Sequence, residues 1–200
     1  MQKPIQFYFD LSSPYGYFAA LKIDKLAKDF DREVSWHPIM LGVAMKITDS
    51  KPLGIVPLKS DYVKNDWDRL SRYMNVPWKM PEKFPIASLA ASRAFYWLVD
   101  EKPEIAKQFV LDIYDTYFGK GRDISDVEII ADIAERLGVV RKDLILAVQD
   151  DAVKVRLKNE TSAAIDAGVF GSPFFIIDGE PFWGADRFWM IKRWLKSGGW

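Results

Sequence analysis

The stretch FYFDLSSPYGYF, residues 7–18, decides the fold because a strand pattern changes there into a helical one. The β-rich run IQFYF predicts a strand over residues 5–9. Pro14 suits the first position of a helix, where its missing N–H would have no partner in any case. Apolar residues at near-helical spacing then predict a helix from Pro14 to about Phe30, with Ser13 as its N-cap.

The hydroxyl of Ser13 has two interpretations. A capping serine accepts a hydrogen bond from a first-turn amide, which contributes about 1 kcal/mol to stability. The same position has free amides and the positive end of the helix dipole, and both stabilise an anion. A thiolate held there would have its pKa lowered toward neutrality. Because the chain has no cysteine, such a thiol must come from a ligand.

The composition excludes several classes of function. The chain has 200 residues and 49% hydrophobic content, enough for a substantial core in one domain, with or without an insertion. Basic and acidic residues both total 28, so no positive field favours nucleic acid. The absence of cysteine excludes disulfides, thiolate zinc sites and a cysteine nucleophile. We find neither a signal-like apolar start nor a membrane-length apolar run, so we expect a cytoplasmic protein with no membrane partner.

A second short strand and a long helical block follow the first helix. The run EVSWHPIM, residues 33–40, predicts a strand parallel to the first one, in a βαβ unit. Between residues 58 and 164 every segment has a helical pattern and none has a strand pattern. Pro103 marks one helix start, and Ser125, with Glu128 three residues later, predicts another N-cap.

The C-terminal part predicts a hairpin and a final helix. In residues 171–187 the run FFII is followed by Asp178-Gly179 and a second strand around residues 181–183, and Asp186 is the expected cap of the last helix. Ser172 precedes Pro173, and such a bond is either an ordinary trans turn or a cis peptide. The cis form would turn the Ser172 backbone outward, where it could pair with an extended peptide.

The predicted order of elements is therefore β-α-β, a helical block, then β-β-α. The two outer parts can join into one mixed four-stranded sheet with the block inserted between them. We predict an α/β fold with a discontinuous sheet domain, residues 1–57 and 165–200, and an inserted helical domain, residues 58–164.

Four stretches together give a resemblance to a known family. They are FYFDLSSPYGYFA (7–19), KPLGIVPLKSDY (51–62), GVFGSPFFIIDGEPFWGADR (168–187) and the helical block between the last two. In this combination the chain resembles the group of 2-hydroxychromene-2-carboxylate isomerases and kappa-class glutathione transferases. The resemblance implies a DsbA-like thioredoxin fold over essentially the whole chain.

The resemblance also implies a glutathione site. Ser13 would be the catalytic residue and would hydrogen-bond the glutathione sulfur, at the position where redox relatives carry a cysteine. The backbone of Ser172, before Pro173, would pair with the cysteinyl part of glutathione. Further implied contacts are Lys59, Trp183, Gly184 and Asp186. Ser50 and Ala185 occupy positions where the family often has asparagine and serine, so their glutathione contacts stay open.

The implied reaction is the glutathione-dependent conversion of 2-hydroxychromene-2-carboxylate to trans-o-hydroxybenzylidenepyruvate, in the breakdown of naphthalene-type aromatic compounds. A glutathione transferase or peroxidase of the kappa type is one alternative, and a DsbA-like binding protein without catalytic activity is another. The expected partners are a small aromatic carboxylate and, since relatives are often dimers, a second copy of the chain.

The remaining polar and aromatic residues have simpler interpretations. Lys22, Lys25 and Lys28 fall on one side of the first helix and are expected to face solvent. His37, the single histidine, is expected to pack in its strand, and one histidine predicts no metal site. The possible lining residues of a substrate pocket in the helical block are Lys64, Trp67, Arg69, Tyr73 and Trp78.

Overall fold

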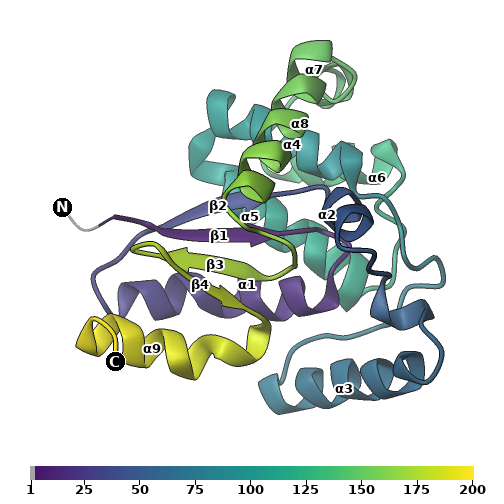
Figure 1. Ribbon diagram of the computed structural model, residues 1–200. Coiled ribbons are helices and arrows are strands. Elements are labelled where there is room, and N and C mark those ends of the chain that lie inside the picture. Colours follow the sequence, from purple (N-terminus) through teal and green to yellow (C-terminus); the bar gives the residue numbers. More distant parts are fainter. Residues whose placement is uncertain (1–2) are drawn as a thin grey trace.

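A computed structural model describes residues 3–200 and shows one mixed sheet of four strands in the order β2-β1-β3-β4 (Figure 1). Strand β1 (Ile5–Phe9) pairs in parallel with β2 (Val34–Pro38) and antiparallel with β3 (Phe174–Ile177). The hairpin partner of β3 is β4 (Glu180–Trp183). This sheet confirms the predicted fold class.

The helices lie above and below the sheet in the view of Figure 1. Helix α1 (Pro14–Lys28) connects β1 to β2, and α9 (Phe188–Ser197) follows the hairpin beyond β4 (Figure 1). The chain from β2 to β3 contains α2 (Leu41–Ile47), η1 (Leu53–Ile55), α3 (Lys59–Met74), α4 (Leu89–Glu101), α5 (Pro103–Tyr114), η2 (Asp115–Gly119), α6 (Val127–Arg136), α7 (Arg141–Ala147) and α8 (Asp151–Asp166), and η3 (Ala185–Arg187) precedes α9. No helix among residues 3–200 has the length and apolar character needed to cross a membrane.

Two segments differ from the sequence-based prediction. The helix α2, which lies between the second strand and the helical block, was not predicted. Residues 75–88 interrupt the expected helical block with an irregular segment. Its prolines at 77, 81 and 85 explain the difference, because proline cannot donate the hydrogen bonds that a continuing helix needs.

Two predicted N-caps are wrong. At the start of α6 the cap is Asp126, whose Oδ1 accepts a hydrogen bond from the Glu128 N–H at 2.9 Å, while the Ser125 hydroxyl accepts from Lys83 Nζ. Serine and aspartate are both good N-cap residues. Here the residue directly before the first helical residue is Asp126, so Asp126 is the cap. At the C-terminal end Asp186 lies within η3 and forms an ion pair with Arg187, so it does not cap α9.

Aromatic side chains of the central strand form the core. Phe7 and Phe9 are fully buried and stack on each other with ring centroids 4.8 Å apart. Phe9 also contacts Phe95 of α4 and Tyr114 of α5, so the core continues from the sheet into the helical region. The division into a sheet domain and a helical domain stays a prediction about chain organisation, and its two parts share this core.

Candidate active site

Ser13 lies at the N-terminus of α1, as predicted. Its backbone is extended and its Oγ accepts a hydrogen bond from the Gly16 N–H at 3.1 Å, which makes it the N-cap. The same hydroxyl donates to the carbonyl oxygen of Ser172 at 3.0 Å. Only 6% of Ser13 is exposed, so the hydroxyl sits at the edge of the core with a fixed orientation.

The segment opposite Ser13 contains a cis peptide between Ser172 and Pro173, one of the two forms considered for this bond. The Ser172 hydroxyl accepts a hydrogen bond from the Asp10 N–H at 2.9 Å. Among residues 3–200 the Ser172 N–H donates to no protein acceptor, whereas its carbonyl already accepts from Ser13. The backbone of Ser172 therefore offers a free donor, and its acceptor becomes free only if Ser13 turns away.

Asp10 links the parts of the site, and sequence reasoning did not select it. Its Oδ1 accepts from the Ser12 N–H at 2.8 Å, the Ser12 hydroxyl at 2.7 Å and the Ser88 hydroxyl at 2.9 Å, and its Oδ2 accepts from the Leu41 N–H at 2.9 Å. The residue is 6% exposed. Four neutral donors thus satisfy a carboxylate that burial would otherwise disfavour. The sequence signal that could have pointed to Asp10 is a charged residue directly after an apolar strand.

The backbone carbonyl of Asp10 also holds the loop of residues 10–13 by hydrogen bonds. Its carbonyl accepts from the Ser13 N–H and from the Tyr114 hydroxyl, both at 2.9 Å. Burial, with a smaller contribution from the Asp10 charge, raises the pKa of Tyr114 well above its usual value, so this hydroxyl remains a protonated donor. Helix α5 thereby holds the end of β1 in place.

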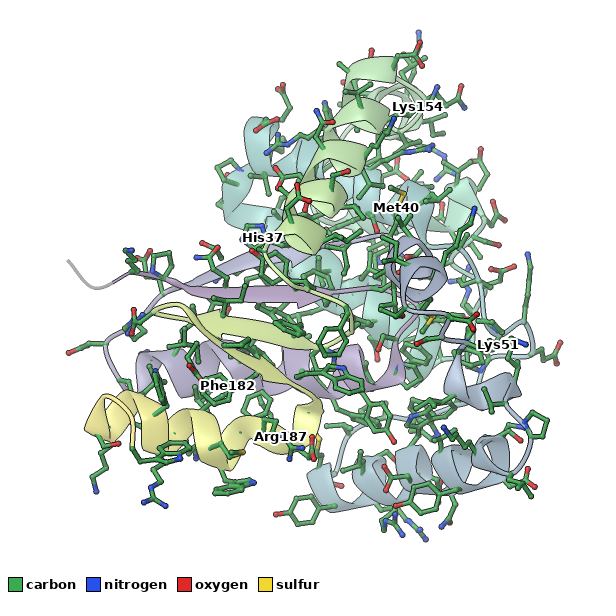
Figure 2. The ribbon with its side chains drawn as sticks, in the orientation of Figure 1. His37, Met40, Lys51, Lys154, Phe182 and Arg187 are labelled. Carbon is green, nitrogen blue, oxygen red and sulfur yellow. The ribbon has the colours of Figure 1, made fainter. Side chains whose placement is uncertain are left out.

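A cleft of about 1600 Å³ opens in front of Ser13. Its lining includes all the sequence-predicted site residues, namely Ser13, Ser50, Lys59, Ser172, Pro173, Trp183, Gly184, Ala185 and Asp186. Met40, Lys51 and Arg187, which Figure 2 labels, also line it and come from three separate segments of the chain. The fold therefore gathers residues that are far apart in the sequence around one hydroxyl.

The charged and polar residues of this cleft differ in their partners. Lys59 begins α3 and Lys51 precedes η1, and among residues 3–200 neither forms an ion pair. Asp186 pairs with Arg187 at 2.9 Å. Ser50 is exposed and its hydroxyl accepts a hydrogen bond from the Thr48 hydroxyl at 3.0 Å. Lys59 and Lys51 thus leave two cations available to an anionic ligand.

The sequence suggested five possible lining residues in the helical block without showing which of them face the cleft. Of these five residues only Trp67 lines the cleft, whereas Lys64, Arg69, Tyr73 and Trp78 do not. The block contributes Tyr62, Asp66, Leu70 and Met74 instead. Lys22 is exposed, as expected, but it also lines the cleft. Spacing alone does not show which face of α3 turns toward α1, and Trp78 lies outside α3 in the irregular segment of residues 75–88.

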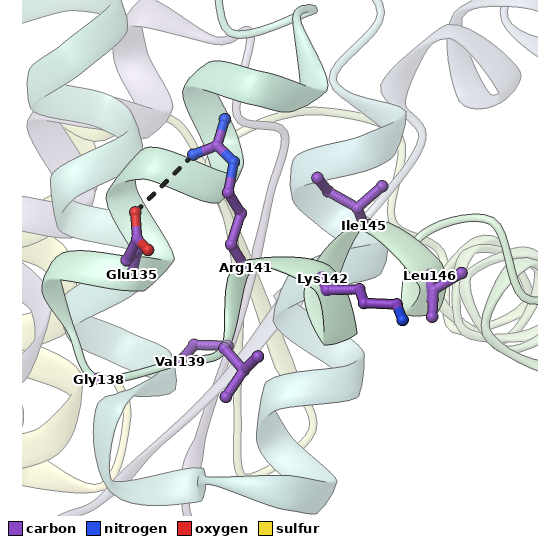
Figure 3. Close-up of a pocket in the computed structure, with 8 residues that line it drawn as sticks. Glu135, Gly138, Val139, Arg141, Lys142, Ile145 and Leu146 are labelled. Atoms are coloured by element: carbon purple, nitrogen blue, oxygen red, sulfur yellow. Dashed lines mark ion pairs between the residues drawn. The ribbon is translucent and has the colours of Figure 1, made fainter.

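A second hollow of about 670 Å³ lies on α6, α7 and the loop between them (Figure 3). Its cation Arg141 already pairs with Glu128, Asp132 and Glu135. None of the sequence-predicted site residues lines this hollow, and we place the active site in the larger cleft.

The comparison with protein families matches residues 4–196 to the DSBA-like thioredoxin domain. The chain belongs to this family. Within it, the chain is similar to the 2-hydroxychromene-2-carboxylate isomerase of Pseudomonas putida, with 28% identity over 94% of this chain and 92% of the relative. Human glutathione S-transferase kappa 1 is 24% identical, over 98% of this chain and 92% of that protein.

A solved structure agrees with this grouping. The structure of a 2-hydroxychromene-2-carboxylate isomerase superposes with a TM-score of 0.86 and 27% identity, and the match covers 96% of this chain and 94% of the other. The DSBA-like fold predicted from the serine motif and the hairpin is therefore confirmed. In this DSBA-like chain Ser13 stands at the N-terminus of α1, and the chain contains no cysteine.

Proposed function

We propose that this protein is a glutathione-dependent isomerase that converts 2-hydroxychromene-2-carboxylate to trans-o-hydroxybenzylidenepyruvate in aromatic catabolism. One observation carries the proposal. The Ser13 hydroxyl lies at a helix N-terminus opposite the cis Ser172-Pro173 peptide, in a chain without cysteine. The similarity to isomerases over nearly the full length supports it.

The residues of the cleft fit glutathione. Among residues 3–200, the N–H groups of Ser172 and Tyr15 donate to no protein acceptor. Ser172 accepts the hydrogen bond of the Ser13 hydroxyl, and Tyr15 follows Ser13 in the first turn of α1. The cations Lys51 and Lys59 have no carboxylate partner there, and glutathione carries two carboxylates. A cleft of about 1600 Å³ also exceeds the volume of roughly 300–1,000 Å³ that is typical of a site for one small ligand.

Bound glutathione would supply a thiolate, a nucleophile that adds reversibly to a conjugated double bond and so permits rotation about it. Rotation of the Ser13 hydroxyl away from the Ser172 carbonyl would direct its proton to the sulfur. The N-terminus of α1, with the free N–H of Tyr15, would lower the pKa of the thiol. Ser13 thus stabilises charge and does not itself attack the substrate.

The other contacts divide between the two ends of the tripeptide. We propose that the Ser172 backbone pairs with the cysteinyl unit and that Asp186, with Trp183 and Gly184, forms the wall at the γ-glutamyl end. Lys59 would bind a carboxylate. Ser50 and Ala185 line the same cleft, and their shorter side chains would make weaker contacts than the asparagine and serine frequent in the family.

The test is the rate of isomerisation of 2-hydroxychromene-2-carboxylate by the purified protein with glutathione, without it, and with S-methylglutathione, which has no free thiol. We expect turnover only with glutathione. Equal rates in all three conditions would refute the proposal.

A kappa-type transferase is the second candidate, because human glutathione S-transferase kappa 1 aligns over 98% of this chain. Faster conjugation of chlorodinitrobenzene or faster hydroperoxide reduction than isomerisation would favour it. No glutathione binding in calorimetry, together with unchanged properties of Ser13→Ala, would favour a binding protein without catalysis. We further propose a homodimer, which light scattering would detect as about twice the 23.0 kDa mass.

A further inference from the structure

Helix α9 lies on the outside of the molecule, below the sheet in the view of Figure 1. Its inner side packs on the sheet, where Ile191 is fully buried and the ring centroid of Phe188 lies 5.5 Å from that of Phe175. Trp189, by contrast, is 61% exposed. Three exposed cations follow Trp189 at spacings that place all four residues on one side of a helix. This outer face of α9 consists of Trp189, Lys192, Arg193 and Lys196.

The cations of the outer face have no acidic partners. Helix α9 contains neither aspartate nor glutamate, and among residues 3–200 none of its three cations forms an ion pair. Asp186, just before α9, is already paired with Arg187. The neighbouring α1 adds the exposed Lys22, whose pKa is lowered by burial and then by the positive charge of Lys192. In a chain with a formal net charge of zero, this face is a local excess of positive charge.

A second exposed tryptophan borders the outer face. Trp200 is 63% exposed, and the Arg193 guanidinium lies 5.1 Å from its ring centroid. The ring also packs edge-on against Trp194, with centroids 5.6 Å apart. Exposed indoles beside lysine and arginine are typical of proteins that bind a membrane surface, because the indole ring settles at the headgroup level and the cations attract anionic lipids.

Two other occupants fit this face less well. A symmetric interface with a second copy would bring the same patch of both copies together, so that cations would face cations. Single-stranded nucleic acid binds in a positively charged groove that follows its backbone, and no residue of α9 lines either of the two hollows described above. The outer side of one helix instead suits the broad surface of a lipid bilayer.

We propose that the outer face of α9 docks this protein on a membrane surface that contains anionic lipid. The Trp189 and Trp200 rings lie among the headgroups, and the three cations of α9 lie beside the lipid phosphates, while the inner side of α9 stays packed on the sheet. This proposal departs from the expectation of no membrane partner. That expectation rested on the absence of a membrane-length apolar run, which a helix lying on the surface does not need.

The test measures co-sedimentation of the full chain with vesicles of phosphatidylcholine alone and with vesicles that also contain about 30% phosphatidylserine. The first variant, Arg193→Gln/Lys196→Gln, removes two cations of the outer face. Its matched control, Lys142→Gln/Lys158→Gln, removes the same charge from exposed positions on α7 and α8, where neither lysine forms an ion pair among residues 3–200. The second variant, Trp189→Ala, removes the central indole, and its control is Leu146→Ala, at a residue of α7 that is 58% exposed.

We expect the wild type and both controls to bind the anionic vesicles, with much weaker binding to phosphatidylcholine alone and in about 0.5 M salt. Arg193→Gln/Lys196→Gln should weaken binding about 25-fold, since each cation near an anionic surface contributes about a fivefold gain. Trp189→Ala should weaken it about tenfold. None of the substituted residues lines the large cleft, so glutathione binding and isomerisation should be unchanged, and failure of the proposed function would leave this test intact.

Four outcomes would overturn the proposal. They are no binding to the anionic vesicles, equal binding to both kinds of vesicle, and equal losses in a variant and its control. The fourth is a different occupant: tighter binding of a single-stranded oligonucleotide than of the vesicles would assign the face to nucleic acid. Likewise, conversion of a dimer to a monomer by Trp189→Ala in light scattering would assign the face to a second copy.

Discussion

The Ser13 hydroxyl donates a hydrogen bond of 3.0 Å to the carbonyl oxygen of Ser172, a residue 159 positions away in the sequence. This bond joins the N-terminus of α1 to the loop that carries the cis peptide. It also occupies the proton that Ser13 would give to a sulfur anion. In the proposed function, binding of glutathione would exchange this hydrogen bond for one to the sulfur, and the Ser13 hydroxyl would only need to rotate.

Ser13→Ala removes that proton while leaving the helix terminus in place. We expect kcat to fall by about 10²–10³, the effect of removing one donor to a developing anion. The pKa of the bound glutathione thiol should rise, and its thiolate absorbance titrated against pH measures this. Ser13→Thr keeps a hydroxyl and is the matched control. An unchanged thiol pKa in Ser13→Ala would contradict the role of Ser13.

Asp10→Ala should destabilise the fold by about 2–4 kcal/mol, because the Ser88 hydroxyl and the Leu41 N–H would lose their acceptor. Asp10→Asn should give an intermediate loss of stability, since only the oxygen of its amide group can accept hydrogen bonds. Urea unfolding measures both. Asp166→Ala, at an exposed position at the end of α8, is the control and should change stability by less than about 0.5 kcal/mol. Equal stability of Asp10→Ala and the wild type would contradict the linking role of Asp10.

Substitutions at Gly16 and Gly42 form a matched pair that tests how closely the residues behind Ser13 are packed. A Cβ atom at Gly16 would lie 2.6 Å from the Tyr114 hydroxyl oxygen and 3.0 Å from Ser172 Oγ, whereas a Cβ at Gly42 in α2 would meet nothing within 4 Å. We expect Gly16→Ala to cost about 1–3 kcal/mol through overpacking and to reduce activity. Gly42→Ala should be neutral or stabilising. Similar effects of the two substitutions on thermal unfolding would contradict this packing argument.

The pH dependence of stability should contain a contribution from His37. Burial lowers the pKa of His37 from its usual value of 6.5 to about 4, while its Nε2 lies 2.9 Å from Gln6 Oε1. Between these two pH values the unfolded chain binds a proton that the folded chain does not. The free energy of unfolding should therefore decrease as the pH falls from 6.5 to 4, by up to about 3 kcal/mol.

The control for this prediction is His37→Gln, which removes the only histidine of the chain. Urea unfolding between pH 4 and 7 should show a smaller pH dependence in the variant, with the difference confined to the region below about pH 6.5. Identical pH profiles for the two proteins would show that His37 is not held in its neutral form.

The elements with strong local signals were predicted from the sequence. Ser13 and Pro14 marked the start of α1, and Asp178 and Gly179 marked the turn of the hairpin, where both residues have positive φ. These features depend on neighbouring residues, so local chemistry is sufficient to find them.

The roles of Asp10 and Lys22 depend on distant contacts, and these roles were not predicted. The acceptor role of Asp10 depends on Leu41 and Ser88, which the fold brings together from 31 and 78 positions away. Lys22 was assigned to solvent because its spacing with the neighbouring lysines matches an exposed helix face. Only the position of α3 beside α1 shows that Lys22 also lines the cleft.

The structure of the protein crystallised with glutathione tests the central claim most directly. We predict the sulfur within hydrogen-bond distance of Ser13 Oγ, roughly 3.0–3.5 Å, and the cysteinyl backbone antiparallel to Ser172. Glutathione bound in this cleft with its sulfur directed away from the N-terminus of α1, or bound only outside the cleft, would contradict the claim.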